Sequence, residues 1–218
     1  MKKILFSLLS LVLMLVPQLA DAHVDNTMLK LSGTEVGWIY LTLGYEHILP
    51  LGLDHILFVL CLFLLSTDLK KIIWQATAFT VAHSITLGLA IYGVFTPPAH
   101  IVEPVIALSI FFVAVENILS DQLKPSRIIL VALFGLIHGM GFASVLADLG
   151  LPANRFLTAL VMFNVGVELG QLTVILLAWF LVAKWFRHKP WYRARVVIPA
   201  SAVIAVIAAY WTIERAFF

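Results

Sequence analysis

Six apolar segments of membrane-spanning length constrain this chain more than any other feature. The segments comprise residues 51–66, 72–95, 101–120, 127–147, 153–183 and 195–214. Most are near the roughly 20 residues that an α-helix needs to cross a hydrocarbon core. Hydrophobic residues make up 62% of the sequence and charged residues only 12%, against roughly 25% charged residues in soluble proteins. The sequence therefore predicts an all-α polytopic membrane helix bundle with about six transmembrane helices over residues 51–218.

The N-terminal residues have the pattern of a secretory signal. Two lysines precede a short apolar stretch that ends in the A-x-A sequence "ADA", which predicts a cleaved signal peptide over residues 1–22. The alternative is an uncleaved first transmembrane helix. Residues 23–50 are expected to form an external N-terminal segment. An interfacial or broken helix is predicted near its end at "ILPLGL", because Pro50 removes a backbone donor and Gly52 loosens the turn.

Basic residues gather in alternate connections between the apolar segments. Nine of them lie in three loops, with the sequences "STDLKK", "SDQLKPSR" and "KWFRHKPWYRAR". The opposite side receives Lys30, Arg155 and Arg215. Because cytoplasmic loops are enriched in lysine and arginine, these three loops are predicted to be cytoplasmic and both ends of the mature chain external. The net charge of +2 does not indicate a nucleic-acid partner; the lipid bilayer is the expected surrounding, and the oligomeric state stays open.

Ionisable side chains within or beside the apolar segments are the main functional signal. Each costs about 2.5–3.5 kcal/mol near the centre of a membrane helix, so a set of them predicts an interior polar site or pathway. The candidate metal ligands are His47, Asp54, His55, His83, Glu116, His138 and Glu168. Imidazoles and carboxylates suit a divalent ion such as nickel, cobalt, zinc or copper, and ligand type alone does not choose between them. Cys61 is the single cysteine, which excludes an intramolecular disulfide and a cysteine metal cluster.

Helical spacing predicts two polar stripes and one close contact between helices. At about 100° per residue, polar side chains of the fifth and second segments fall on narrow faces. The stripes consist of Asn164, Glu168 and Gln171, and of Thr77, Thr80 and Ser84 with His83 at its edge. Gly135 and Gly139 lie four residues apart around His138, and small residues at that spacing let a neighbouring helix approach closely.

A structural role for these polar groups is the simpler alternative. Buried polar pairs can join membrane helices by hydrogen bonds alone, and this applies to His83, Asn164 and Glu168. Asp54 stands at a possible helix start, where aspartate is a preferred capping residue. His100 and His188 are expected to be solvated and are left out of the site.

Four ordered blocks carry a resemblance to a known family. They read "HILPLGLDHILF", "FTVAHSITL", "VEPVIALSIFFVAVEN" and "FGLIHGMGFA", and the similarity covers about residues 44–180. They resemble the HupE/UreJ family of bacterial membrane proteins, in particular its second branch. The resemblance implies an inner-membrane protein for nickel or cobalt uptake that serves hydrogenase and urease.

Two family motifs assign roles to residues of this chain. The first motif is a histidine, five residues and then Asp-His, and the matching positions are His47, Asp54 and His55, with six residues between them. The second is a His-Gly pair within a later helix, which His138 and Gly139 match. The resemblance therefore implies a metal-binding role for these histidines, with a departure of one residue at His47.

The leading hypothesis is a secondary permease for a divalent transition metal. Asp54 and His55 are expected to capture the ion from the external side. Successive weak sites through the bundle are expected at His83, Glu116, His138 and Glu168. The sequence has no G-x-x-x-x-G-K-[ST] motif for nucleotide binding, so a gradient or a separate partner is expected to drive transport.

Two other functions remain open from the sequence. Asp54, His55, His83, Ser84 and His138 faintly resemble, in residue type, the zinc site of intramembrane hydrolases of the alkaline-ceramidase-like type. The other alternative is a non-transporting assembly factor that handles a metal. Convergence of Asp54, His55, His83 and His138 at one closed point, with no polar route to the cytoplasmic side, favours a hydrolase or a structural site, whereas a file of polar groups through the bundle favours transport.

Overall fold

The computed structural model describes residues 31–95, 97–142 and 155–218, which form an all-helical structure. The main helices are α2 (Gly33–Ile48), α3 (Leu53–Leu65), α4 (Leu69–Ile91), α5 (Ala99–Leu119), α6 (Arg127–Gly141), α8 (Phe156–Ala178) and α10 (Ile198–Phe217). The π-helical turn η4 (Trp179–Ala183) continues α8 into α9 (Lys184–Phe186), and η5 (Arg193–Val197) leads into α10. The predicted all-α class is confirmed. The predicted signal peptide lies outside the described residues.

Four helical segments of the described chain are long and apolar enough to cross a membrane. They are Leu69–Ile91, Ala99–Leu119, Phe156–Phe186 and Arg193–Phe217. α2 and α3 qualify together as a fifth span, with their axes bent by 69°. α6 is apolar but has only 15 residues, and the end of the predicted fourth span falls in the undescribed residues 143–154. The predicted count of six is therefore approximate.

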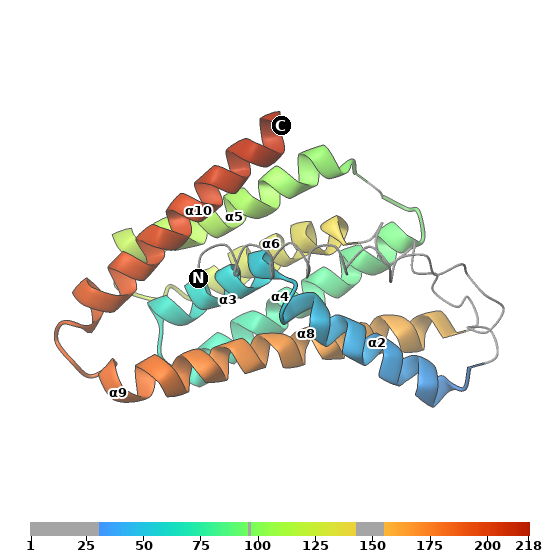
Figure 1. The fold of residues 1–218 in the computed structure, drawn as a ribbon, viewed down its shortest axis with the longest axis horizontal. Coiled ribbons are helices and arrows are strands. Elements are labelled where there is room, and N and C mark those ends of the chain that lie inside the picture. Colours follow the sequence, from blue (N-terminus) through green and yellow to red (C-terminus); the bar gives the residue numbers. More distant parts are fainter. Residues whose placement is uncertain (1–30, 96, 143–154) are drawn as a thin grey trace, which may run out of the picture.

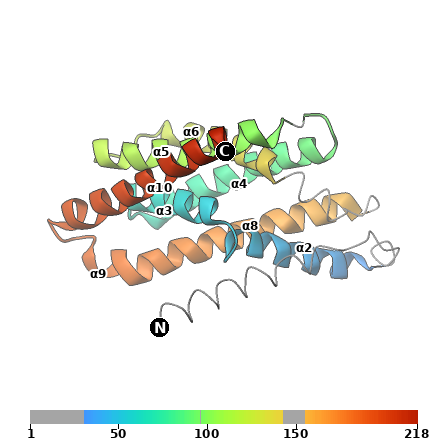
Figure 2. The same ribbon diagram turned by 45° about the horizontal axis from the view of Figure 1, so that its top comes forward.

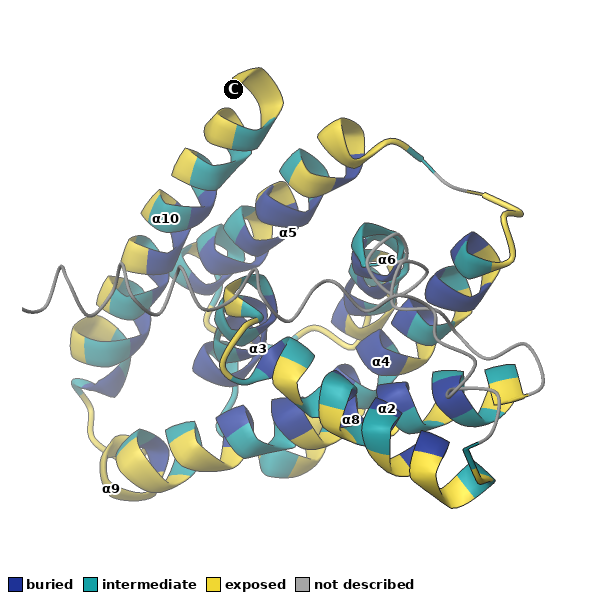
Figure 3. Cartoon of the chain, turned by 45° about the vertical axis from the view of Figure 1, so that its right-hand side comes forward, coloured by how far each residue is buried: buried dark blue, intermediate teal, exposed yellow. Residues whose placement is uncertain are grey.

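The bundle consists of three closely packed helix pairs around α3. α2 packs along α8, α4 along α6 and α5 along α10, while α3 contacts α4, α5 and α8 (Figures 1 and 2). Buried residues form the inward faces of these helices and exposed residues the outward faces (Figure 3). The outward faces carry large apolar side chains, such as Val81, Leu108, Leu133 and Val206. A bundle with an apolar exterior of this kind is suited to a lipid environment.

The three basic loops lie at one end of the bundle. The connections from α3 to α4, from α5 to α6 and from α9 to η5 lie together on the left of Figure 1, and the start of α2 and the end of α10 lie away from them. This arrangement agrees with the predicted alternation of loops. Two of the nine basic residues are not free surface charges, because Arg127 is buried and Arg193 donates hydrogen bonds to the carbonyls of Asn117 and Ile118.

The predicted close contact of the fourth apolar segment is confirmed between α4 and α6. A β-carbon at Gly135 would lie 2.5 Å from the carbonyl oxygen of Phe79, and one at Gly139 would collide with the carbonyl of His83. Only glycine permits the two backbones to approach so closely. This contact holds His83 and His138 on adjoining helix surfaces.

The break between α2 and α3 brings two histidines together. In one continuous helix, His47 and His55 would be separated by eight rises of about 1.5 Å, or roughly 12 Å along the axis. The chain instead turns by 69° at the predicted "ILPLGL" break, and a β-carbon at Gly52 would collide with the carbonyl of His47. The last turn of α2 and the first turn of α3 therefore face one another.

Candidate metal centre

Three histidines from three helices converge inside the bundle. His47 ends α2, His55 begins α3 and His83 lies in the middle of α4. One potential ligand nitrogen from each lies within 4.8 Å of the others. The ring centroids of His47 and His55 are 4.7 Å apart, and that of His83 lies 5.9 Å from His55. The structure thus gathers three predicted site residues, including His47, whose spacing departs from the family motif.

His138 of α6 extends this group on one side. Its ring centroid lies 5.1 Å from that of His55, and its Nε2 is 2.9 Å from the hydroxyl of Ser109 on α5. The Ser109 hydroxyl donates its single proton to the carbonyl of Ile106 at 2.7 Å, so it accepts from Nε2–H of His138. Nδ1 of His138 therefore carries the lone pair. Ser109 was not among the predicted site residues, since a lone serine in an apolar segment carries no signal.

Each of these four histidines has a ring nitrogen without a hydrogen-bond partner. Nε2 of His47, His55 and His83 and Nδ1 of His138 are all buried, and none finds a partner among the described residues. Buried polar groups in proteins are nearly always hydrogen-bonded. Four exceptions side by side fit a set of lone pairs directed at a ligand, and neutral imidazole is a common ligand of divalent metals.

Asn164 of α8 fixes the orientation of His83. The amide nitrogen of Asn164 donates to the carbonyl of Leu160 at 2.8 Å, so its oxygen faces His83. That oxygen lies 3.2 Å from Nδ1 of His83 and must accept a proton from it, which leaves Nε2 with the lone pair. Partners that fix a ring tautomer in this way are usual around metal-binding histidines. The sequence placed Asn164 in a polar stripe but not in the metal site.

A cavity of about 520 Å³ leads to this histidine group. Its wall includes His47, His55, His138, the carboxylates of Glu46, Asp54 and Glu103, and Arg215. A concave site lined mainly by one sign of charge raises the local concentration of counter-ions. Glu46 and Glu103 were not predicted as site residues, because nothing in their spacing relates them to the histidines.

Asp54 lines the cavity but is paired with a cation of the protein. The two terminal guanidinium nitrogens of Arg215, near the end of α10, each lie 3.1 Å from one of its carboxylate oxygens. Gly52 is the N-cap of α3 and no side chain caps this helix, so the capping alternative for Asp54 is wrong. Asp54 is outside the group of converging ligand atoms.

Glu168 continues the polar groups away from the cavity. Its two carboxylate oxygens accept hydrogen bonds from the hydroxyls of Thr77 at 2.6 Å and Thr80 at 2.5 Å. The two predicted stripes on α4 and α8 therefore face one another. Gln171 lies one turn further along α8, and both polar atoms of its buried amide are without a partner in the described structure. Asn164, Glu168 and Gln171 form a file that runs from the histidines toward the end with the basic loops.

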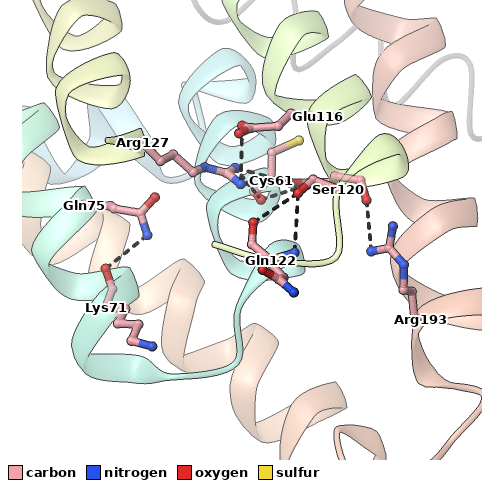
Figure 4. A network of polar contacts seen from close by, with 9 residues as sticks. Cys61, Lys71, Gln75, Glu116, Ser120, Gln122, Arg127 and Arg193 are labelled. Atoms are coloured by element: carbon pink, nitrogen blue, oxygen red, sulfur yellow. Dashed lines mark hydrogen bonds and ion pairs between the residues drawn. The ribbon is translucent and has the colours of Figure 1, made fainter. Parts of the chain in front are cut away.

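Glu116 does not join the histidines. It lies seven residues after Ser109 on α5, which corresponds to about 10 Å along the helix axis. Its carboxylate is 3.5 Å from the guanidinium of Arg127, within the polar network of Figure 4. Its predicted role as a metal ligand has no geometric support, because Arg127 occupies the place of a cation.

Phenylalanine rings surround the histidine group on its inner sides. The ring of Phe142 lies 3.9 Å from that of His47 and stacks on Phe163 at 5.3 Å. Phe79 lies 5.8 Å from His55, and Phe58 lies 5.3 Å from His138. Phe142 also lines the cavity, whereas Phe58, Phe79 and Phe163 are buried. His47, His55 and His138 therefore border the cavity, and His83 lies behind them.

The hydroxyl that the hydrolase alternative requires lies apart from this group. Ser84 donates to the carbonyl of Thr80 at 2.6 Å and lines a different pocket from His55 and His138. The structure therefore brings together three histidines of that constellation but not its serine.

Comparison with known proteins identifies the family. The family model described as "HupE / UreJ protein" matches residues 23–215, which extends the similarity beyond the four blocks on both sides. Neither a curated protein nor a solved structure matches the chain. The family match covers nearly the whole sequence, including every helix that contributes a histidine. This chain belongs to the HupE/UreJ family of membrane proteins.

Proposed function

We propose that this protein is a secondary permease for a divalent transition metal, with nickel or cobalt as its substrate. The observation that carries the proposal is a set of four buried imidazole nitrogens without partners among the described residues, three of them on histidines that line an acidic cavity and the fourth on His83. Membership of a family associated with nickel and cobalt uptake supports the choice of metal. A gradient or a separate partner is the proposed driving force, since the sequence has no nucleotide-binding motif.

The first step of the proposed cycle is capture from the cavity. Carboxylates of Glu46 and Glu103 attract the hydrated cation. His47, His55 and His83 then replace water ligands, and Asn164 holds the ring of His83 in the required tautomer. Neutral imidazoles bind the ion without neutralising its charge, which keeps the site weak enough for release.

The second step moves the ion along the file on α8. Glu168 is the first carboxylate beyond the histidines, and Thr77 and Thr80 supply hydroxyl oxygens at the same level. Oxygen ligands bind nickel and cobalt more weakly than imidazole does. The oxygen site therefore does not trap an ion that the histidines have released, and the ion can leave it toward the end with the basic loops.

Uptake into vesicles tests both steps. The purified protein is reconstituted into liposomes loaded with a metal-sensitive dye, and nickel or cobalt is added outside. Glu168→Gln keeps the shape of the side chain and one acceptor oxygen but removes its charge, so it should abolish uptake while leaving metal binding in calorimetry unchanged. Leu169→Gln, on the exposed neighbouring face of α8, is the matched control. Normal uptake by Glu168→Gln would refute the proposed pathway.

A zinc-dependent hydrolase is the second candidate. Three histidine ligands with one side open to a cavity are the arrangement of many catalytic zinc sites, where the metal activates a water. His47, His55 and His83 form such a group, and His47 and His55 line the cavity. Release of fatty acid from a lipid amide by the zinc-loaded protein, together with absence of uptake, would favour this function.

A further inference from the structure

A second cavity lies at the basic-loop end of the bundle, away from the histidines. It has a volume of about 370 Å³ and lies between the start of α4 and the turn that follows α9. Its polar or ionisable lining residues are Thr67, Asp68, Lys70, Trp179, Arg187 and His188. The metal pathway uses none of them.

Arg187 contacts two other lining residues of this cavity. Its Nε donates to Nε2 of His188 at 3.0 Å, and its guanidinium carbon lies 5.8 Å from the centre of the Trp179 ring. The two terminal nitrogens of Arg187 have no hydrogen-bond partner in the part of the chain that the structure describes. These nitrogens form the planar fork that suits phosphate oxygens.

The other polar groups also favour an anion. Asp68 is the one carboxylate of the cavity, and it is engaged with the amide of Lys70 at 3.1 Å and the ammonium of Lys71 at 3.7 Å. Nε1 of Trp179 is buried and has no acceptor among the described residues, and indole can only donate. Lys70 adds a second positive charge at the N-terminal turn of α4, where the helix dipole also favours an anion.

The surroundings favour a lipid as the source of this anion. Ile73 and Trp74 lie three and four residues after Lys70 on α4, and Leu176 lies three residues before Trp179 on α8. Residues at these spacings share a helix face, one turn deeper into the membrane than the cavity. All three side chains are exposed. An acyl chain could therefore lie along them while the phosphate occupies the cavity.

We propose that this cavity binds the phosphate of an anionic phospholipid headgroup. The guanidinium of Arg187, the ammonium of Lys70 and Nε1–H of Trp179 bind the phosphate, and the apolar faces of α4 and α8 contact the acyl chains. Basic pockets between membrane helices at the cytoplasmic side commonly hold such headgroups. The proposal is independent of metal transport.

Native mass spectrometry of the purified full-length protein tests this site. The probes are phosphatidylglycerol, zwitterionic phosphatidylcholine and inorganic phosphate. Each basic residue near a membrane surface contributes about fivefold to anionic lipid binding, so Lys70→Gln with Arg187→Gln should weaken phosphatidylglycerol binding about 25-fold. Lys124→Gln with Lys189→Gln removes two charges from loops at the same end, outside the cavity lining, and should leave that binding unchanged.

A third variant tests the indole donor. Trp179→Phe keeps an aromatic ring beside Arg187 but removes Nε1–H, and should weaken phosphatidylglycerol binding about tenfold. The proposed site would be overturned by any of three outcomes. Both double variants could lose phosphatidylglycerol binding equally, the parent could bind the two lipids equally, or Trp179→Phe could have no effect. If inorganic phosphate competes at concentrations equal to those of phosphatidylglycerol, the cavity binds a free anion and the lipid assignment is wrong.

Discussion

The histidine group and the Arg127 network are two buried polar regions that differ in how their polar groups are paired. In the network, Arg127 donates to the amide oxygen of Asn117 at 3.2 Å and pairs with Glu116, and Asn117 donates to the carbonyl of Cys61 at 2.8 Å (Figure 4). In the histidine group, four ring nitrogens have no partner among the described residues. In the network, Nε of Arg127 also lacks a hydrogen-bond partner among the described residues, but both of its terminal nitrogens are engaged. In the Arg127 network the polar groups hold helix ends together. In the histidine group the ring nitrogens stay available for a ligand.

This difference separates a structural role from a binding role. A buried polar atom without a partner costs about 1–3 kcal/mol of folding free energy, so the histidine group destabilises the metal-free fold. A buried ion pair with additional hydrogen bonds ties its elements together, and removing one member exposes the other as an unpaired charge. Substitutions in the histidine group should therefore weaken metal binding without lowering stability. Substitutions in the Arg127 network should lower stability without weakening metal binding.

The largest effect is expected at His55. His55→Leu removes a nitrogen of the three-histidine group and fills the space with an apolar side chain. Binding of nickel and cobalt should fall below detection in calorimetric titration. The melting temperature of the metal-free protein should stay equal or rise, because no hydrogen bond of Nε2 is lost. Parent-like binding would remove the basis for treating this region as the binding site.

Arg127 should show the reverse pattern. Arg127→Met leaves Glu116 as an unpaired carboxylate and should lower the free energy of unfolding by about 3–5 kcal/mol, as measured by denaturation in detergent. Metal affinity of the protein that remains folded should be unchanged. Lys124→Met, an exposed residue of the same loop, is the control and should have little effect. A stable Arg127→Met protein would show that the network does not support the fold.

A smaller effect is expected at Asn164. Asn164→Leu removes the acceptor that fixes the tautomer of His83, and loss of such a partner typically weakens metal binding about 10–100-fold. Asn164→Asp retains an acceptor oxygen and should keep most of the affinity. If both variants bind as the parent does, Asn164 only joins α4 to α8.

Ser109 should give the smallest change. Ser109→Ala removes the acceptor for Nε2–H of His138, but His138 lies beside the three converging ligands rather than among them. Removing a hydrogen-bond partner of a direct metal ligand typically lowers metal affinity at least about tenfold. Ser109→Ala should lower it by less than that. Ser109→Thr keeps the hydroxyl and should match the parent. A loss as large as that of His55→Leu would place His138 among the essential ligands.

The sequence predicted which helix faces are polar, because helical spacing alone determines which side chains share a face. Glu168, Thr77 and Thr80 were each placed in a predicted stripe, and their contact with one another was found only in the structure. The break at Pro50 and Gly52 was also readable from residue type. The spacing could not show the consequence of this break. The break brings His47 next to His55, although one extra residue separates the motif positions in this chain.

Pairings between distant segments were beyond sequence reasoning. Asp54 and Arg215 lie 161 residues apart, and Glu116 meets Arg127 across a loop. Whether a carboxylate meets a metal or a guanidinium depends on the rotation of each helix about its axis. That rotation is set by packing against neighbours, as at Gly139, and a single sequence does not encode it in a pattern that can be read directly.

The ion pair between Asp54 and Arg215 also orders the events of biosynthesis. Asp54 is made with α3, and Arg215 follows only after α4, α5, α6, α8 and most of α10 have been synthesised, so Asp54 is made before its partner exists. The wall of the cavity is complete only when α10 has been inserted beside α5. A nascent chain halted before that helix therefore lacks the finished mouth of the site, although all four histidines are already in place.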